Sequence, residues 1–222
     1  MNTMKFWAIV VSICCESFAT ETAQANYVVN GSFEAVQIGS PYLSTNPATI
    51  PGWTHTGSVG DSLLFAVGYS DNLGSITTAG DGKQFVTIGG GFGGSGTGYW
   101  SQTLIGLTPA TSYSLSFEMA SEAAYSGSQS ITVDFTGGSS TAPQTFSAAP
   151  TSVNYWRGWE TKTMTFVASS SSVTLRFGAT AQYDVGLDNV IVNPSVVPEP
   201  STVILTSLGL LGALASMRRR KT

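Results

Sequence analysis

Short runs of alternating apolar and polar residues recur through the middle of the chain. In residues 112–119 every second side chain is apolar, and these apolar members are Tyr113, Leu115, Phe117 and Met119. This period of two gives an extended strand one apolar face. Five further runs alternate in the same way or are rich in β-forming residues: 85–88, 131–135, 162–166, 173–177 and 187–192. The pattern predicts many short strands.

Turn-forming residues separate these runs, as in residues 136–140 and 168–172. Helical periodicity is hard to find between residues 26 and 194, and no alternation of strands with helices points to a parallel α/β fold. The glycine-rich residues 89–98 are not followed by the Gly-Lys-Ser/Thr of a phosphate-binding loop, and they indicate a flexible hairpin loop. We therefore expect an all-β fold, a single jelly-roll β-sandwich over residues 26–194.

The first 25 residues have the pattern of a cleavable signal peptide. Lys5 provides the positive charge, and residues 6–15 form an apolar run that is too short for a stable membrane anchor. Residues 23–25, Ala-Gln-Ala, offer a small-x-small cleavage pattern. The mature chain is therefore expected to begin near Asn26, outside the cytoplasm.

Composition excludes several classes of function for the mature chain. Both cysteines, Cys14 and Cys15, lie in the signal peptide, so the domain has no disulfide, no thiol chemistry and no cysteine-ligated zinc. A lipid anchor at Cys14 is disfavoured, because Ile13 replaces the small residue expected there. Residues 26–194 carry four basic and ten acidic residues, a net charge of −6. A domain this acidic, with no basic stripe, is not expected to bind nucleic acid.

The tail, residues 195–222, has three parts in a fixed order. The tripeptide Pro198, Glu199 and Pro200 comes first, the uncharged residues 201–217 could form a short membrane helix, and residues 218–221 are basic. This order resembles the PEP-CTERM sorting signal of Gram-negative bacteria. The resemblance implies recognition by an exosortase, a membrane cysteine protease, and transfer of the domain to the cell surface, the biofilm matrix or the medium. An ordinary tail anchor is the alternative.

An ordered set of short motifs extends through residues 27–193. Its members are Asn30-Gly31-Ser32-Phe33-Glu34, Pro51-Gly52-Trp53, Gly80-Asp81-Gly82-Lys83, Ser101-Gln102-Thr103-Leu104, Leu107-Thr108-Pro109, Trp159 and Gly186-Leu187-Asp188-Asn189-Val190. Together they resemble the galactose-binding-like jelly rolls, with the plant cell-wall domain-of-unknown-function proteins and their bacterial counterparts as nearest relatives. They are also similar to carbohydrate-binding modules of families 4, 9 and 22. The resemblance implies two antiparallel sheets packed face to face.

In the related carbohydrate-binding modules a structural calcium joins the first strand to the last. The resemblance transfers this site to five positions here: Ser32, Glu34, Asp81, Lys83 and Asp188. Calcium takes six to eight oxygen ligands, which carboxylates and backbone carbonyls of this set could supply. Two carboxylates brought together by paired chain ends would repel each other without a cation between them. The alternative is that the acids cap turns or face water.

Aromatic residues are the candidates for sugar contacts, because their faces cover the apolar faces of sugar rings. Trp53 and Trp159 fall at positions that the resemblance marks as structural, and we expect them in the core. The expected exposed ligand platform consists of Tyr99, Trp100, Tyr155, Trp156 and Arg157, which border the glycine loop or lie among turn residues. The alternative is that these aromatics are isolated on the surface or plug the sandwich edge.

Catalytic residues are not expected in this sequence. The only histidine, His55, is interpreted as a surface residue, and no serine lies in a Gly-x-Ser-x-Gly elbow. A glycosidase needs two carboxylates in one cleft. Asp134 could lie opposite Glu118 on a neighbouring strand, but the strand period points Glu118 away from the core and towards solvent. A hydrolase remains the distant alternative.

The sequence thus predicts an exported, exosortase-processed cell-surface or matrix protein of a Gram-negative bacterium. Its β-sandwich is expected to bind extracellular polysaccharide, such as the exopolysaccharide that accompanies such sorting signals. The alternative is a structural or adhesion protein of the biofilm matrix that does not bind sugar.

Overall fold

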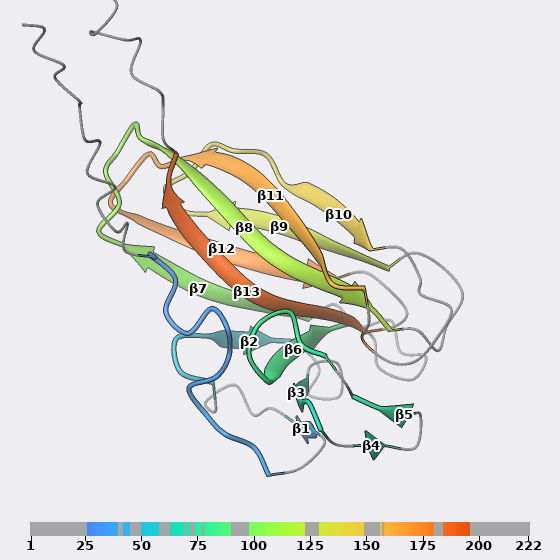
Figure 1. Cartoon of the computed structure of the whole chain (residues 1–222). Coiled ribbons are helices and arrows are strands. Elements are labelled where there is room, and N and C mark those ends of the chain that lie inside the picture. Colours follow the sequence, from blue (N-terminus) through green and yellow to red (C-terminus); the bar gives the residue numbers. More distant parts are fainter. Residues whose placement is uncertain are drawn as a thin grey trace, which may run out of the picture.

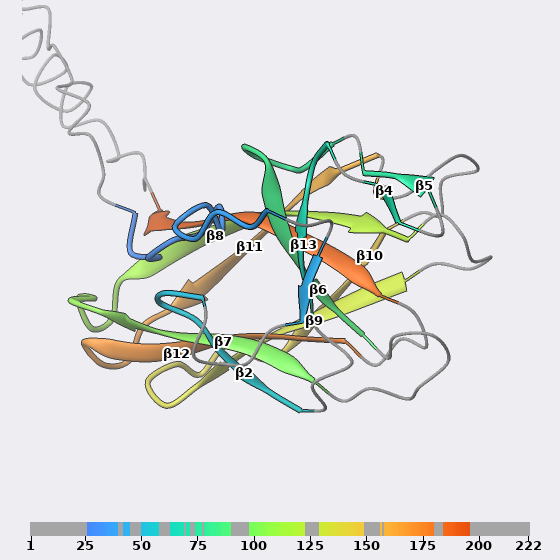
Figure 2. The ribbon, with the colours of Figure 1, turned by 90° about the horizontal axis from the view of Figure 1, so that it is seen from below.

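The computed structural model describes most of the middle of the chain. The described residues are 26–39, 42–44, 50–57, 63–68, 70–71, 74–76, 78–89, 98–122, 129–148, 156, 158–179 and 184–195. They form two antiparallel sheets, of six and five strands, stacked as layers (Figures 1 and 2). This confirms the expected all-β sandwich. The signal peptide and the sorting tail lie outside the described residues, among which no helix is long and apolar enough to cross a membrane.

The six-stranded sheet has the order β1-β3-β6-β13-β8-β11. Its strands are β1 (Tyr42–Ser44), β3 (Leu63–Ala66), β6 (Gln84–Ile88), β13 (Val185–Pro194), β8 (Ser112–Ser121) and β11 (Glu160–Val167). The last long strand, β13, therefore lies near the middle of the sheet. Its two neighbours, β6 and β8, both come from much earlier in the chain.

The five-stranded sheet has the order β10-β9-β12-β7-β2. Its strands are β10 (Gln144–Ala148), β9 (Gln129–Thr136), β12 (Ser172–Ala179), β7 (Tyr99–Ile105) and β2 (Thr54–Thr56). A separate two-stranded antiparallel sheet pairs β4 (Ser70–Asp71) with β5 (Gly74–Ser75). The long strands cover the six runs that the alternation predicted.

The core lies between the two sheets. The alternation in β8 and β12 turns one set of side chains inward, and the buried members include Tyr113, Leu115, Phe117, Val173, Leu175 and Phe177. The rings of Phe117 and Phe177 meet across the two sheets, with centroids 5.1 Å apart. The buried side chains of this described core all come from residues 28–192. Residues 26–195, called the sandwich domain below, therefore contain this core.

The start and the end of the sandwich domain lie side by side. The backbone N–H of Tyr27 donates to the carbonyl of Val192 (3.0 Å), and the N–H of Val190 donates to that of Gly31 (2.9 Å). The Asn26 side chain extends this ladder like a peptide group, accepting from the N–H of Val192 at 2.9 Å and donating to the Val190 carbonyl at 3.4 Å. The expected pairing of the chain ends is confirmed, although the opening segment consists of turns rather than a strand.

Candidate functional site

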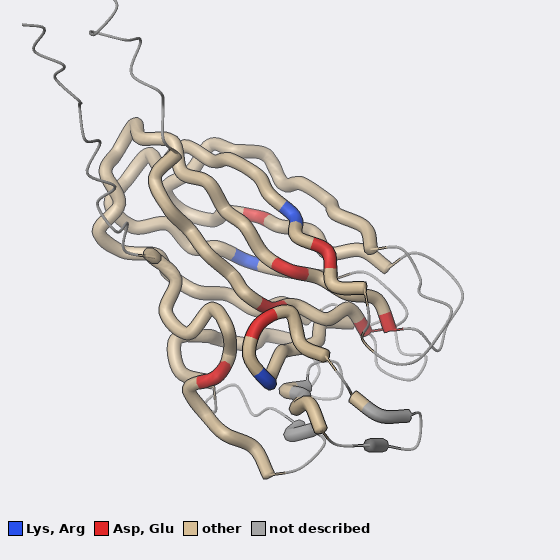
Figure 3. Tube along the Cα trace, in the orientation of Figure 1, with Lys and Arg blue, Asp and Glu red and all other residues tan. Residues whose placement is uncertain are grey.

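The outer face of the five-stranded sheet is lined mostly by hydroxyl groups. Because side chains alternate along each strand, the residues between the buried ones point to solvent. We call this surface the hydroxyl face; its members are Thr54, Tyr99, Ser101, Thr103, Ser130, Thr132, Asp134, Thr145, Ser147, Thr174 and Arg176. Charged positions are sparse along the whole described chain (Figure 3).

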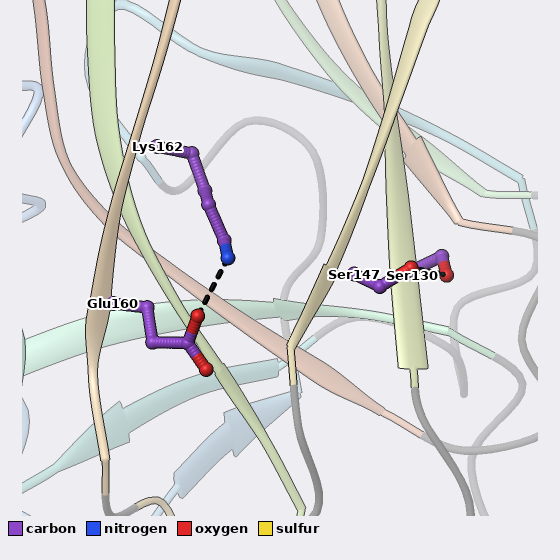
Figure 4. Close-up of polar contacts among 4 residues, drawn as sticks. All are labelled: Ser130, Ser147, Glu160 and Lys162. Carbon is purple, nitrogen blue, oxygen red and sulfur yellow. Dashed lines mark hydrogen bonds and ion pairs between the residues drawn. The ribbon is translucent and has the colours of Figure 1, made fainter.

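Several of these hydroxyls hydrogen-bond across neighbouring strands. Thr103 and Thr174 are joined at 3.1 Å, and Ser130 and Ser147 at 2.9 Å, with the latter side chains meeting between β9 and β10 (Figure 4). A hydroxyl has one donor and two acceptor positions, so each pair keeps capacity for a further partner. The face therefore presents ordered hydroxyls to any molecule that covers it.

A hollow of about 240 Å³ interrupts this face. Gly178 forms its floor and has Tyr99 opposite it on one neighbouring strand and Thr132 opposite it on the other. The missing side chain at Gly178 creates the space, and a methyl group there would lie 3.7 Å from Cβ of Tyr99, an ordinary contact distance. Arg176 and Asp134 line the same hollow.

Arg176 is held in place from two sides. It forms an ion pair with Asp134, its register partner on β9, and its guanidinium lies 5.1 Å from the centre of the Tyr99 ring. The hydrogen bond to Asp134 raises the pKa of Arg176 above its usual value, so Arg176 keeps its positive charge. The hollow thus offers an aromatic ring, a planar donor and a carboxylate, while its two charges cancel.

The expected platform of exposed aromatics is wrong for Trp100, which is 0% exposed. Trp100 follows Tyr99 on β7, so the strand alternation that turns Tyr99 outward turns Trp100 into the core. Its Nε1 donates to the Thr87 carbonyl at 3.0 Å, and the His55 ring packs 4.9 Å away. His55 is therefore buried, which contradicts its interpretation as a surface residue.

Trp156 is also 0% exposed, so it does not belong to an exposed platform. It belongs to a second hydrophobic cluster, called the outer cluster, of Ile76, Phe85, Ala120 and Trp156. The Trp156 ring packs 5.3 Å from that of Phe85, and both it and Trp159 lie over Gly186, where a side chain would collide with them. Trp156 thus plugs the outer face of the six-stranded sheet.

The other predictions for the aromatic residues and Arg157 have mixed outcomes. Trp53 is buried in the main core as expected, and Trp159 packs half-buried against the outer cluster. Tyr99 is half-buried and lies on the hydroxyl face, where it lines the hollow. Tyr155 and Arg157 lie outside the described residues.

The sequence interpretation missed Arg176, Asp134 and Gly178 as parts of one site. The alternation in residues 173–177 was the available signal, because it places Arg176 between two buried residues and hence outward. Nothing in the sequence pairs β12 with β7 on one side and with β9 on the other, and that pairing brings the three residues together.

Two of the predicted calcium ligands instead bind the N–H groups of one turn. Oε1 of Glu34 accepts from the backbone of Lys83 at 2.5 Å and of Gln84 at 2.6 Å. Oδ2 of Asp188 accepts from the N–H of Asp81 at 2.8 Å. Backbone N–H groups thus occupy one oxygen of Glu34 and, with the N–H of Asn189 on Oδ1 at 2.7 Å, both oxygens of Asp188. The geometry is that of the alternative interpretation, in which the acids cap a turn.

The remaining predicted ligand, Ser32, is half-buried in the opening segment. Among the described residues, no group of three or more histidine, cysteine or acidic side chains is placed to hold a metal ion. The five residues as arranged therefore do not fit a calcium cage, and calcium binding stays a prediction of the resemblance.

Melting with and without a chelator tests that prediction. Calcium at a hundredfold excess over its Kd would raise the free energy of unfolding by about 2.7 kcal/mol, because it would bind only the folded state. Magnesium at the same concentration is the control for a nonspecific ionic effect. Equal melting midpoints in calcium and in chelator would contradict the predicted metal site.

Asp188 is a buried carboxyl group in an acidic setting. It is 0% exposed, and its register partner on β8 is Glu118. Burial, with smaller effects from Asp81 and Glu118, raises the pKa of Asp188 from 3.8 to about 8, although the N–H groups of Asp81 and Asn189 oppose the shift. Glu118 points away from the core, as its strand position predicted.

The expectation that Asp134 could lie opposite Glu118 is wrong. Asp134 is on β9 of the five-stranded sheet, whereas Glu118 is on β8 of the six-stranded sheet. The two carboxylates therefore do not share a cleft.

The Glu160–Lys162 ion pair, which lies on β11, is a separate contact with an N···O distance of 2.6 Å (Figure 4).

Comparison with known proteins gives two family matches. The model of a family described as "Protein of unknown function (DUF642)" matches residues 26–192, and the model of the PEP-CTERM protein-sorting motif matches residues 196–221. No curated protein matches the chain.

Several solved structures are similar to this chain at low sequence identity. A family 61 carbohydrate-binding module, solved with β-1,4-galactotriose, is 17% identical with a TM-score of 0.50, over 78% of this chain and 100% of that one. A family 4 module is 19% identical (TM-score 0.46, 76% and 99% covered). The C-terminal family 22 module of Clostridium thermocellum Xyn10B is 12% identical (TM-score 0.44, 67% and 88% covered). At these identities the likeness shows the fold alone.

Proposed function

The chain belongs to the DUF642 family of proteins of unknown function and carries a PEP-CTERM sorting motif, and on this premise we propose that it binds extracellular polysaccharide as an exported surface or matrix protein. The motif supports export and sorting through a membrane. Processing by an exosortase of a Gram-negative bacterium, at or after Pro198-Glu199-Pro200, is the finer part of the proposal.

The hydroxyl face with its hollow carries this proposal. Sugar-binding sites combine an apolar ring surface with hydrogen-bonding groups that satisfy the sugar hydroxyls. Tyr99 supplies the ring, and Arg176, Asp134 and Thr132 supply donors and acceptors around the same 240 Å³ hollow. This site replaces the tryptophan platform as the expected contact surface.

The charge distribution of the hydroxyl face favours an uncharged polysaccharide as the ligand. The Arg176–Asp134 ion pair cancels its own charge, and the other named members of the hydroxyl face are uncharged. An ion-pair contact with an acidic polysaccharide would need an unpaired cation and would weaken as salt rises. Binding through hydroxyls is therefore expected to change little with salt.

We expect Gly178→Val to weaken polysaccharide binding by tenfold or more while leaving the fold intact. The valine side chain would occupy the floor of the hollow, and valine suits a strand better than glycine does. The measurement is affinity electrophoresis of the sandwich domain in a panel of soluble uncharged polysaccharides. The exopolysaccharide of the bacterium that produces the protein is added to the panel.

Ser116→Val is the matched control, because Ser116 is half-buried on the outer side of β8 in the other sheet. It should bind like the wild type. Retardation of Gly178→Val equal to that of the wild type would exclude the hollow as the binding site. No retardation of the wild type in any polysaccharide would favour the structural or adhesion alternative.

A further inference from the structure

A second hollow, of about 360 Å³, adjoins the first along β7. Its wall includes Ser101 and Thr103 of β7 and Thr54 of β2, all on the hydroxyl face. Ser101 lies opposite Arg176 in the strand register, so the two hollows share a border. From Tyr99 to Ile105 the strand extends about 20 Å, enough for more than one sugar ring.

The second hollow differs from the first in its exposed aliphatic side chains. Val29 is 61% exposed and Ile105 is 72% exposed, and both line it together with Tyr27. The only other large hydrophobic residue that is exposed among the described residues is Val167, at 43%, on the edge strand β11. Two of three such residues thus gather in one hollow on a surface otherwise lined mainly by hydroxyls.

The fold holds Val29 in this exposed position. The side-chain amide of Gln102 accepts from the N–H of Val29 at 2.7 Å and donates to its carbonyl at 2.8 Å, as a neighbouring strand would. Gly52 lies against the same backbone with a φ of 85°, and a side chain there would press on both Val29 and Gln102. The aliphatic wall is therefore fixed rather than carried by a free loop.

We propose that this second hollow seats an acetyl group of an uncharged polysaccharide whose neighbouring unit occupies the first hollow, an inference that rests on the proposed function. Apart from the faces of its rings, a hydroxylated polysaccharide has few apolar groups that could contact Val29 and Ile105, and the acetyl methyl is a compact one. An acetyl oxygen can accept a hydrogen bond from Thr103 when Thr174 is the donor within the Thr103–Thr174 pair. The Ser101 hydroxyl already donates to the Thr54 carbonyl at 3.3 Å. Acetyl esters and acetamido groups share this chemistry.

The first experiment compares pairs of probes in which one member carries acetyl groups and the other does not. Acetylated glucomannan is compared with the same polymer after mild alkaline deacetylation, and N-acetylglucosamine oligomers are compared with glucose oligomers of equal length. Calorimetry of the sandwich domain should show about fourfold tighter binding of the acetylated member in at least one pair, the factor that ~0.8 kcal/mol for one buried methyl gives. The pair that responds identifies the ester or the amide as the source.

The second experiment removes the aliphatic wall. Ile105→Ser should lose the preference for the acetylated probe and keep the affinity for the deacetylated one. Val167→Ser makes the same kind of change on another surface and should keep the preference, and Gly178→Val should weaken binding of both members. Melting midpoints of all three variants verify that each is folded.

The outcomes separate the two proposals. Equal affinity of the wild type for acetylated and deacetylated probes, or a preference that survives Ile105→Ser, would overturn the acetyl site and leave the proposed function standing. Absence of binding to all four probes would overturn the acetyl site, and together with no retardation in the whole polysaccharide panel it would overturn the proposed function as well.

Discussion

Trp156→Ala is expected to lower the free energy of unfolding by about 3–5 kcal/mol, the usual cost of truncating a large buried aromatic side chain. The ring fills the space above Gly186 and packs against Phe85, so its removal leaves a cavity over Gly186. Trp156 also has a positive φ of 49°, a strained conformation for a bulky residue that only surrounding packing can maintain. The midpoint of thermal unfolding should fall by about 10 °C.

Urea unfolding followed by circular dichroism measures this change. Trp159→Ala is the comparison, because Trp159 is only half-buried at the edge of the same cluster and should cost less. Polysaccharide affinity, measured well below the melting midpoint, should remain because Trp156 lies on the other sheet from the hydroxyl face. A loss of affinity without a loss of stability would restore Trp156 as a ligand contact.

The contribution of Asp188 to the free energy of unfolding is expected to fall as the pH rises from about 4 to about 8. Burial raises the pKa of Asp188 from 3.8 to about 8, so between these values the folded protein retains a proton that the unfolded chain has released. The contribution is complete below pH 4 and is lost as the pH passes through the folded value. A shift of this size corresponds to a change on the order of 5 kcal/mol in the free energy of unfolding.

Asp188→Asn isolates this contribution, because asparagine does not titrate and can still accept from the N–H of Asp81. The wild type should be the more stable protein at pH 4, and the difference should shrink or reverse by pH 9. The measurement is the free energy of unfolding in urea at intervals of pH, in chelator. Parallel curves for the two proteins would contradict the raised pKa. A bound cation would favour the ionised carboxyl, so repeating the series in calcium also tests for metal at Asp188.

Local sequence patterns predicted much of the fold. A period of two in β8, β9, β11 and β12 is a property of neighbouring residues, and it determines which side of a strand is buried. The same parity correctly turned Glu118 outward. The same parity also implies that Trp100 is buried if Tyr99 is exposed, because the two residues are consecutive on β7 and cannot face the same side.

The candidate site was predictable only in part, because its residues come from strands distant in sequence. Tyr99 was named from the sequence, but Asp134 and Arg176 meet it only through the pairing of β12 with β7 and β9. The motif resemblance correctly placed Glu34, Asp81 and Asp188 around one turn. It did not show that backbone N–H groups of this turn would bind the carboxylates of Glu34 and Asp188.

The amino-acid sequence by itself determined the class of fold through local alternation, and the family and the sorting motif through residue order. The pairing of the chain ends was implied only by the family resemblance. Only the tertiary structure decided which aromatics are buried by packing against distant residues, as Trp156 is over Gly186. It also decided where missing and exposed side chains combine into hollows, as at Gly178 and beside Ile105. Such surfaces arise from strand order, which no single segment encodes.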